Sequence, residues 1–306
     1  MSFAKFLCVS SQFCDHHHHL LFKILETSRD PSIRSNIVIA LGDVAVSFSS
    51  IIDENSNELY KGLSDLDLVV KKNTLMVLTH LILNGMIKVK GQLGEMAKCL
   101  EDEEPRVSDL AKLFFTELST KDNAIYNNLP DGASVILFFG GWYRSWHAVI
   151  SHLSSGDHAV EEKAFQSTMR YIFSFIEKVC PLPHAFSLTH SPPQPQEKQA
   201  ENIIDKLCQR FRLSDDPRQW RDIAFCMALL PFKSERSVKK LIEGLPFYRD
   251  KLHDADVFAH FADMLNKARG NKGAKPETEL NEFESVRARF FGGGAVRVRV
   301  MVLTKE

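Results

Sequence analysis

Apolar positions recur at a fixed spacing along the first 120 residues of the chain. A shift of 37 residues places Ile33 on Val70 and on Val107. Three further apolar sets superimpose under the same shift: Ala40, Val77 and Phe114; Leu41, Leu78 and Phe115; Val44, Leu81 and Leu118. Within each copy these sets lie at spacings 0, +1 and +4, which share one face of an α-helix. The pattern predicts one helix per copy with an equivalent buried face.

A shorter apolar match precedes each of these helices. It reads LFKIL (21–25), LYKGL (59–63) and MAKCL (96–100). The intervening segments are SRDP (28–31), SDLD (64–67) and EDEEP (101–105), where Ser and Asp suit a helix N-cap and Pro suits the first turn. Residues 20–120 therefore predict three helix–turn–helix units. Because one unit cannot cover its own apolar faces, we expect successive units to stack into an all-α solenoid.

The turn between the two helices has a recurring polar pattern. Asp is followed four residues later by a basic residue, from Asp30 to Arg34 and from Asp67 to Lys71. This pattern and the 37-residue period are similar to HEAT repeats, whereas the tetratricopeptide pattern is absent. The third unit departs from the pattern, with Ser108 at the basic position.

Helical patterns continue beyond residue 120 without the 37-residue register. They cover 160–178, 197–211, 215–230, 234–245 and 249–269, whereas 179–196 holds five of the twelve prolines. We expect HEAT-like repeats at 1–131, an irregular insert at 132–149 and a helix continuing the solenoid at 150–178. A proline-rich insert at 179–196, further helical repeats at 197–270 and a disordered tail at 271–306 complete the predicted organisation.

Composition excludes several classes of protein. The 306 residues are 44% hydrophobic and 25% charged, with a net charge of −1, so no overall basic excess indicates a nucleic-acid binder. The uncharged stretch from Asn73 to Ile87 is shorter than the roughly 20 residues of a membrane span. We therefore expect a soluble protein without a membrane segment. The six cysteines form no CxxC pair, which favours reduced thiols in the cytosol or nucleus.

No catalytic motif is present in the sequence. The phosphate-binding lysine loop, GxSxG and HExxH are all missing, so we predict no catalytic residue, no cofactor and no enzyme activity. CDHHHHL (14–20) suggests metal binding, since Cys14 and His18 are four residues apart. A structural zinc ion takes four converging ligands, so we interpret this run as solvated histidines and predict no metal site.

Basic residues gather at the ends of one predicted helix. Lys71, Lys72, Lys88 and Lys90 flank it, and Arg34 has an equivalent place in the preceding unit. Stacked repeats would align such residues into rows, which suit a phosphate backbone recognised by charge. Ordinary solubilising lysines are the alternative. These five residues are our candidates for nucleic-acid or partner contacts.

Several segments carry a family resemblance: RSNIVIALGDVAV (34–46), KKNTLMVLTHLILNGMIKVKG (71–91), CLEDEEPRVSDLAKLFF (99–115), ISHLSSGDHAVEEKAFQSTMRYIFSFIEK (150–178) and QWRDIAFC (219–226). They resemble the condensin complex subunit 1 family, the HEAT-repeat regulatory subunit of condensin I. The resemblance covers most of 4–284 and implies a segment from the C-terminal half of a longer subunit. In the family, LPD (129–131) runs directly into ISHLSS, so our hypothesis for both inserts is that they are translated introns or gene-model errors.

The resemblance implies a non-enzymatic scaffold that acts in mitotic chromosome condensation. Implied partners are the condensin kleisin and SMC subunits, with chromatin or DNA as a further partner and no membrane or small-molecule substrate. The implied location is the nucleus and condensed chromosomes, and also the cytoplasm. The alternative is a generic HEAT-repeat adaptor that binds peptide segments in trafficking or transport. Salt-dependent binding to random duplex DNA would distinguish the two.

Overall fold

The computed structural model describes residues 2–87, 92–120, 149–178, 195–232 and 235–270. The predicted inserts at 132–149 and 179–196 lie outside the described residues except for their last one or two positions, and the tail at 271–306 lies wholly outside. Residues 1–190 with 216–229 form one compact unit, and residues 191–215 with 230–306 form a second. Every regular element of the described residues is a helix, so the all-α prediction is confirmed there.

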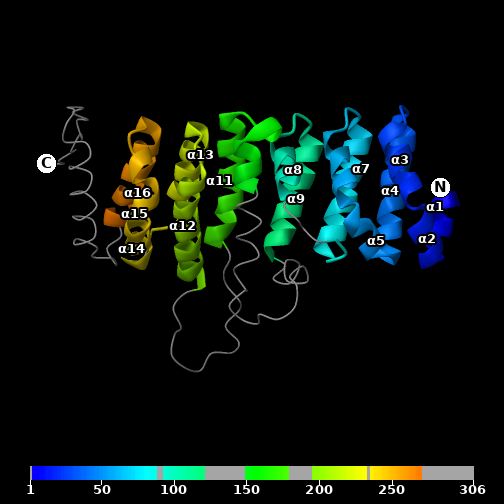
Figure 1. Ribbon diagram of the computed structural model, residues 1–306, viewed down its shortest axis with the longest axis horizontal. Coiled ribbons are helices and arrows are strands. Elements are labelled where there is room, and N and C mark those ends of the chain that lie inside the picture. The colour runs from blue at the N-terminus through cyan, green and yellow to red at the C-terminus, as the bar shows by residue number, and fades with distance from the viewer. Residues whose placement is uncertain (1, 88–91, 121–148, 179–194, 233–234, 271–306) are drawn as a thin grey trace, which may run out of the picture. The chain divides into compact units, whose positions relative to one another are not determined.

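Three helical hairpins follow one another in the first unit, as the 37-residue spacing predicts (Figure 1). The first pairs α3 (His19–Thr27) with α4 (Pro31–Ser47). The second pairs α6 (Ser56–Tyr60) and η1 (Lys61–Ser64) with α7 (Leu68–Leu83), and α5 (Ser49–Glu54), which packs on α4, leads into it. The third pairs α8 (Leu93–Lys98) and η2 (Cys99–Glu101) with α9 (Pro105–Thr120). Two short helices precede them: α1 (Ser2–Leu7) and α2 (Ser11–His17).

The long second helices begin where the sequence predicts. Asp30 accepts a hydrogen bond from Ser32 N at 2.8 Å, and Asp67 accepts bonds from Val69 N and Val70 N at 2.9 and 3.2 Å. These bonds satisfy backbone N–H groups that have no partner inside the helix. The predicted capping therefore fixes the start of α4 and of α7.

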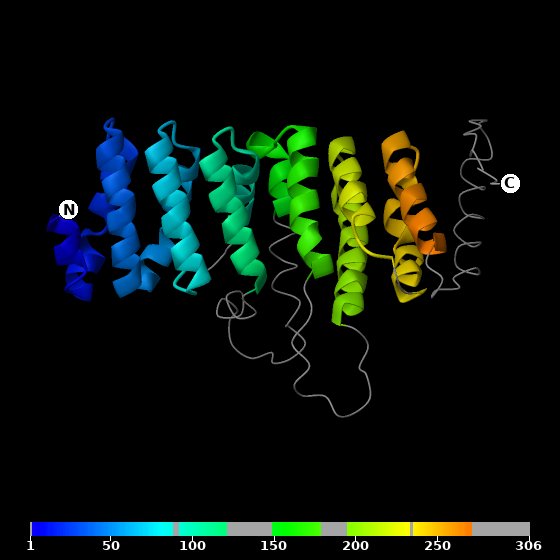
Figure 2. The ribbon, with the colours of Figure 1, turned by 180° about the vertical axis from the view of Figure 1, so that it is seen from behind.

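The second helices lie side by side, with α4 packed on α7 and α7 on α9 (Figure 2). Leu41, Leu78 and Phe115, which share one repeat position, are fully buried. Val77 is partly exposed, but its methyl groups press on α4, where a Cβ on Gly42 would come within 2.9 Å of Val77 Cγ1. Each repeat thus supplies apolar cover to the next, and the first unit is a segment of an α-solenoid.

The remainder of the first unit continues the helical packing. The predicted single helix at 150–178 is wrong: residues 149–154 are helical, and η4 (Gly156–His158) separates them from α11 (Glu162–Lys178). The break contains Gly156, whose φ of +73° is a left-handed conformation that does not continue an α-helix. Helix α13 (Pro217–Ala228) also belongs to this unit. Helix α11 contacts α9, η2 and α13. Asp216 caps α13 by accepting a bond from Arg218 N at 3.0 Å.

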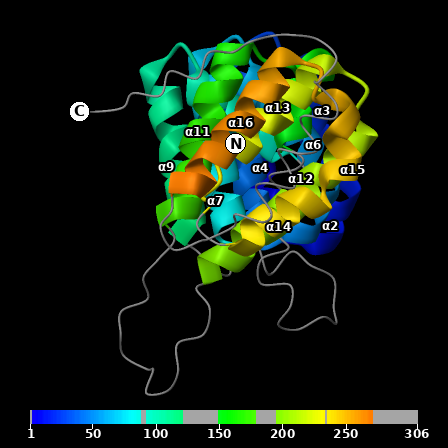
Figure 3. The same ribbon diagram turned by 90° about the vertical axis from the view of Figure 1, so that its left-hand side faces the viewer.

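The second unit contains α12 (Pro195–Leu213), α14 (Glu235–Glu243), α15 (Leu245–Tyr248), η5 (Arg249–Lys251) and α16 (Ala255–Gly270), several of which are labelled in Figure 3. Phe211, Tyr248 and Phe261 form its aromatic core, with the last two rings stacked 4.3 Å apart. The predicted single helix at 249–269 is wrong at its start. Asp254 accepts bonds from the second and third residues of α16, so this helix begins only at Ala255.

Candidate protein-interaction surface

One row of apolar residues faces solvent across the three repeats. Ile39, Met76 and Leu113 lie 37 residues apart on α4, α7 and α9. They are 37%, 53% and 54% exposed, respectively. Because these helices are successive neighbours, the three side chains form a row that we name the apolar ladder. Single exposed apolar residues are ordinary, but exposed apolar residues that recur at one repeat position on neighbouring helices favour an interaction site.

Further exposed apolar residues extend the ladder along α7. Val69 lies seven residues, or two helical turns, before Met76 and is 56% exposed. Leu66 and Leu68 flank the capping residue Asp67 at the start of this helix and are also exposed. Because Asp67 caps α7, the turn before the helix is held in place and Leu66 and Leu68 are exposed to solvent at a fixed position.

Residues of both charges border the ladder. Asp43 on α4 and Asp109 on α9 are exposed carboxylates, whereas Lys72 on α7 is partly exposed. Lys112 forms an exposed ion pair with Asp109 at 3.5 Å. A duplex phosphate backbone favours a face of one positive sign, whereas apolar residues with a mixed polar rim are typical of protein interfaces. The composition of this face therefore favours a protein partner.

Two of the predicted contact residues join adjacent repeats. Arg34 Nε and Nη2 each donate to Asp65 at 2.8 Å, and Lys71 Nζ lies 2.6 Å from Asp102 Oδ2. All four side chains are less than a quarter exposed. The Arg34 guanidinium lowers the pKa of Asp65. Both bases lie 31 residues before their acidic partners, so the same bond recurs between successive repeats.

The remaining predicted contact residues have different placements. Lys72 is partly exposed on α7, and Lys88 and Lys90 lie outside the described residues. The contact role of all five basic residues stays a prediction. For Arg34 and Lys71 the carboxylates already match the positive charge, so a phosphate would have to compete with an existing ion pair.

Sequence reasoning missed the acidic partners, although a signal was present. Asp65 and Asp102 are themselves 37 residues apart, as Arg34 and Lys71 are. Matching acids and bases at the repeat period would have predicted both pairs. In the third repeat, where Ser108 replaces the base, the hydroxyl donates to Leu100 O at 2.7 Å instead.

A polar pocket of about 320 Å³ opens between the third repeat and α11. It is lined by Leu100, Glu101, Asp102, Ser108, Lys112, Ser167 and Tyr171. Tyr171 Oη donates to Lys112 O at 3.0 Å, which ties α11 to α9 beside the pocket. Because acidic and basic groups both line it, this pocket suits a polar side chain of a partner better than an apolar ligand.

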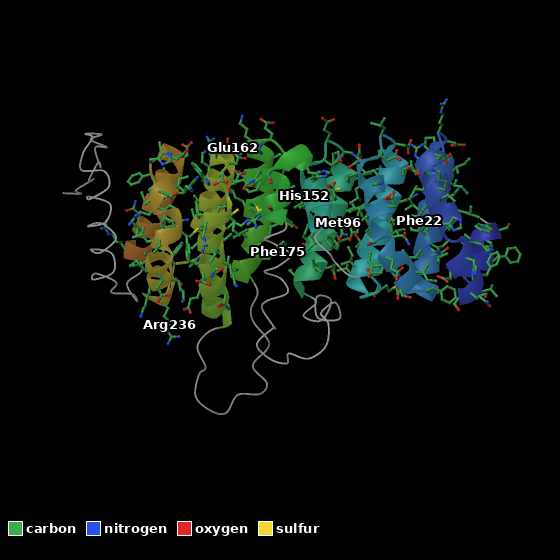
Figure 4. The ribbon with its side chains drawn as sticks, viewed as in Figure 1. Phe22, Met96, His152, Glu162, Phe175 and Arg236 are labelled. Carbon is green, nitrogen blue, oxygen red and sulfur yellow. The ribbon has the colours of Figure 1, made fainter. Side chains whose placement is uncertain are left out.

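One cluster of titratable side chains has the residue types of a metal site. Glu95 Oε1 lies 2.6 Å from His152 Nε2 and 3.2 Å from His158 Nδ1, and Lys98 Nζ is 3.1 Å away (Figure 4 labels His152). Burial lowers the pKa of His152. Burial alone would raise the pKa of Glu95, but Lys98 and His152 lower it overall. No motif or repeat spacing in the sequence marks these two histidines.

The N-terminal histidine run makes local contacts. His18 Nδ1 lies 3.0 Å from Cys14 O, and the thiol of Cys14 is buried. His16 Nδ1 lies 2.7 Å from Gln12 O, and the His17 ring packs on Phe13. His16 and His18 therefore contact carbonyl groups of their own helix turn, and His18 Nε2 also lies 3.4 Å from Asn55 Nδ2. The cluster at Glu95 is the stronger candidate for a metal.

Comparison with known proteins places the chain in a family. The family described as non-SMC mitotic condensation complex subunit 1 matches residues 32–180. Condensin complex subunit 1 of Xenopus laevis is 41% identical over 96% of this chain and 19% of its own length. The Homo sapiens protein of the same name is 40% identical over 93% and 18%, and that of Saccharomyces cerevisiae is 39% identical over 78% and 17%.

The chain spans less than a fifth of the length of these curated relatives. Among the described residues, no helix combines the length and apolar character that a membrane crossing requires. The matched region includes the second helices of all three repeats, α4, α7 and α9. The relatives agree on one name across animals and yeast, and the chain belongs to the condensin complex subunit 1 family.

Proposed function

We propose that this chain is a non-enzymatic scaffold segment of a condensin regulatory subunit and acts in mitotic chromosome condensation. Family membership supports the condensin assignment. A stacked helical architecture supports the scaffold role, because solenoids offer extended surfaces for other chains. The proposed location is the nucleus and condensed chromosomes, with a cytoplasmic pool.

The apolar ladder of Ile39, Met76 and Leu113 is the observation that carries the proposal. An apolar row with a rim of both charges fits an extended segment of another protein, whose side chains would contact successive repeats. The proposed partners are the kleisin and SMC subunits of condensin. A secondary contact with the DNA backbone is proposed for Lys72, Lys88 and Lys90.

A triple substitution of the ladder tests the proposal. The full chain with Ile39→Ser, Met76→Ser and Leu113→Ser is compared with wild type for binding to purified kleisin and SMC subunits by calorimetry. We expect affinity to fall by at least about tenfold, since losing three interface side chains removes more than the 1.4 kcal/mol that this factor requires.

The matched control removes exposed apolar side chains elsewhere. Val9 and Leu213 are 81% and 75% exposed and are not residues of the ladder, so Val9→Ser with Leu213→Ser makes a similar chemical change at other positions. We expect the control to bind as wild type does. Equal affinity of the ladder variant and the control would contradict the proposed surface.

A second measurement addresses the DNA contact. Binding to random duplex DNA is measured at two salt concentrations for wild type and for a Lys72→Gln, Lys88→Gln and Lys90→Gln variant. Phosphate contact predicts affinity that falls with salt, and a weaker dependence in the variant. No binding to DNA or to any condensin subunit would instead favour the generic adaptor.

A further inference from the structure

Three side chains with metal-binding atoms converge from two separate parts of the chain. Glu95 belongs to α8, His152 to the helical residues 149–154 and His158 to η4. One ligand atom from each lies within 4.8 Å of the other two. Residues 95 and 152 are 57 positions apart, so the cluster depends on the tertiary fold.

The local backbone is shaped to bring the two imidazoles together. Gly156 has φ +73°, a left-handed conformation that favours glycine, and Val160 N donates to Leu153 O to close the loop. The two rings stack with centroids 4.5 Å apart and an angle of 18° between their planes. They therefore present their nitrogens to the same carboxylate.

A glycine on α8 makes room for this arrangement. A Cβ added to Gly94 would lie 2.4 Å from Cδ2 of the His152 ring. Any larger residue would push the ring away from Glu95. The cluster is thus a fitted contact between α8 and the following segment.

One of the ligand separations already suits a small dication. In a tetrahedral zinc site with bonds of about 2.05 Å, neighbouring ligand atoms lie about 3.3 Å apart. Glu95 Oε1 and His158 Nδ1 already have this separation, at 3.2 Å. The 2.6 Å contact between Glu95 and His152 is a hydrogen bond and would open by about 0.7 Å when a metal replaces its proton.

The position is already one that attracts a cation. Lys98 Nζ lies 3.1 Å from Glu95 Oε1 and 3.2 Å from His158 Nδ1. Its side chain is 25% exposed, so the flexible stem can turn the ammonium group into water. Lys98 would then act as a competitor for the site.

We propose that Glu95, His152 and His158 form a binding site for a divalent transition-metal ion of the zinc type, with Lys98 as a built-in competitor. Two imidazoles and one carboxylate leave a fourth tetrahedral position for water. The bound ion would link the third repeat to the segment that follows it. This proposal is independent of the proposed function.

Zinc titration of the full chain tests the site. To exclude weak zinc uptake by the histidine run at 16–19, the parent chain and all variants carry His16→Gln, His17→Gln and His19→Gln. Affinity for Zn²⁺ is measured by competition with a chromophoric chelator in the presence of a non-thiol reductant. Cobalt substitution then distinguishes histidine and carboxylate ligands from thiolates by the visible spectrum.

Two variants move the affinity in opposite directions. His158→Gln removes a ligand that is mostly exposed, and we expect binding at least about tenfold weaker. Lys98→Met removes the competitor, and we expect binding about tenfold tighter because like charges repel at this range. A gain of zinc affinity in Lys98→Met cannot result from misfolding. This variant therefore tests the site even if His158→Gln loses affinity because it misfolds.

His80→Gln is the matched control. His80 is exposed on α7, away from the cluster, and its removal should leave zinc affinity unchanged. Zinc affinity that is the same in His158→Gln, in His80→Gln and in their parent would overturn the proposal. A thiolate absorption band with cobalt would overturn it as well.

Discussion

Asp222 is a buried carboxyl group whose ionisation should destabilise the fold at neutral pH. It lies on α13 and is 3% exposed. Its Oδ2 lies 3.6 Å from Arg218 Nε but has no hydrogen-bond partner among the described residues. Burial raises the pKa of Asp222 to about 6, against an ordinary value of 3.8, and the Ser154 hydroxyl and Arg218 only partly offset this rise.

The pKa difference sets the size of the effect. A carboxyl group with a raised pKa in the folded state holds its proton more tightly there than in the unfolded state. The resulting penalty is absent at low pH, grows between pH 3.8 and about 6, and is complete above that range. Linkage predicts that ionisation of Asp222 lowers the free energy of unfolding by roughly 1 kcal/mol at pH 4.5 and by roughly 3 kcal/mol at pH 7.5.

Asp222→Asn keeps the shape of the side chain and removes its charge. We expect the free energy of unfolding at pH 7.5 to rise by about 1–3 kcal/mol, since the variant also loses the attraction to Arg218. The gain should shrink by about 2 kcal/mol at pH 4.5. Urea denaturation followed by circular dichroism at both pH values measures the difference.

Asp43→Asn is the matched control, because Asp43 is exposed on α4. It should leave stability nearly unchanged at both pH values, as most surface substitutions do. If Asp222→Asn instead lowered stability equally at pH 4.5 and 7.5, the carboxylate would be stabilised by Arg218 more than it is penalised by burial. Burial would then not be the dominant influence on the pKa of Asp222.

Three other predictions concern the joints between repeats. A double-mutant cycle on Arg34 and Asp65 should give a coupling free energy of about 1–3 kcal/mol in chemical denaturation. A coupling free energy of zero would mean that solvent separates the two side chains. Because Arg34 lowers the pKa of Asp65, this coupling should persist at neutral pH and disappear as the carboxyl group is protonated in acid. Leu78→Ala should cost about 2–5 kcal/mol of unfolding free energy through the cavity it leaves, and a melting temperature equal to wild type would contradict the packing. Gly94→Ala should lower the melting temperature by displacing the His152 ring, whereas Gly270→Ala, where a Cβ meets nothing, should not.

The repeat helices are predictable because one buried face recurs at three equivalent positions. Leu41, Leu78 and Phe115 show this, since a single shift of the sequence finds all three and the structure buries them all. Helices α1 and α2 escaped prediction because six and seven residues are too few to establish a helical period. No period in the sequence marks the break between α5 and α6 at Asn55, where the side-chain amide donates to Ile51 O at 3.2 Å and lies 3.4 Å from His18 Nε2.

The candidate sites also differ in how far the repeat period predicts them. The pairing of Arg34 with Asp65 follows the repeat period, and so the sequence contains it even though it was overlooked. The meeting of Glu95 with His152 follows no period, because it joins α8 to a segment 57 residues later. Only the folded backbone brings those two residues together.

The exposed residues of a repeat helix can indicate a binding partner, whereas the buried residues cannot. Leu41 and Leu78 must be apolar for the repeats to stack, so their character says nothing about partners. Ile39, Met76 and Leu113 are about half buried, so serine at these positions should lower the free energy of unfolding by about 1 kcal/mol each, less than the loss expected for Leu78→Ala. The apolar ladder is therefore not required by the fold of its own chain. If the triple serine variant still unfolds cooperatively, with a loss of stability of no more than about 3 kcal/mol, yet does not bind its partner, the loss of binding is due to the missing contact. A much larger loss of stability would show that these residues belong to the core and would remove the main support for the interface.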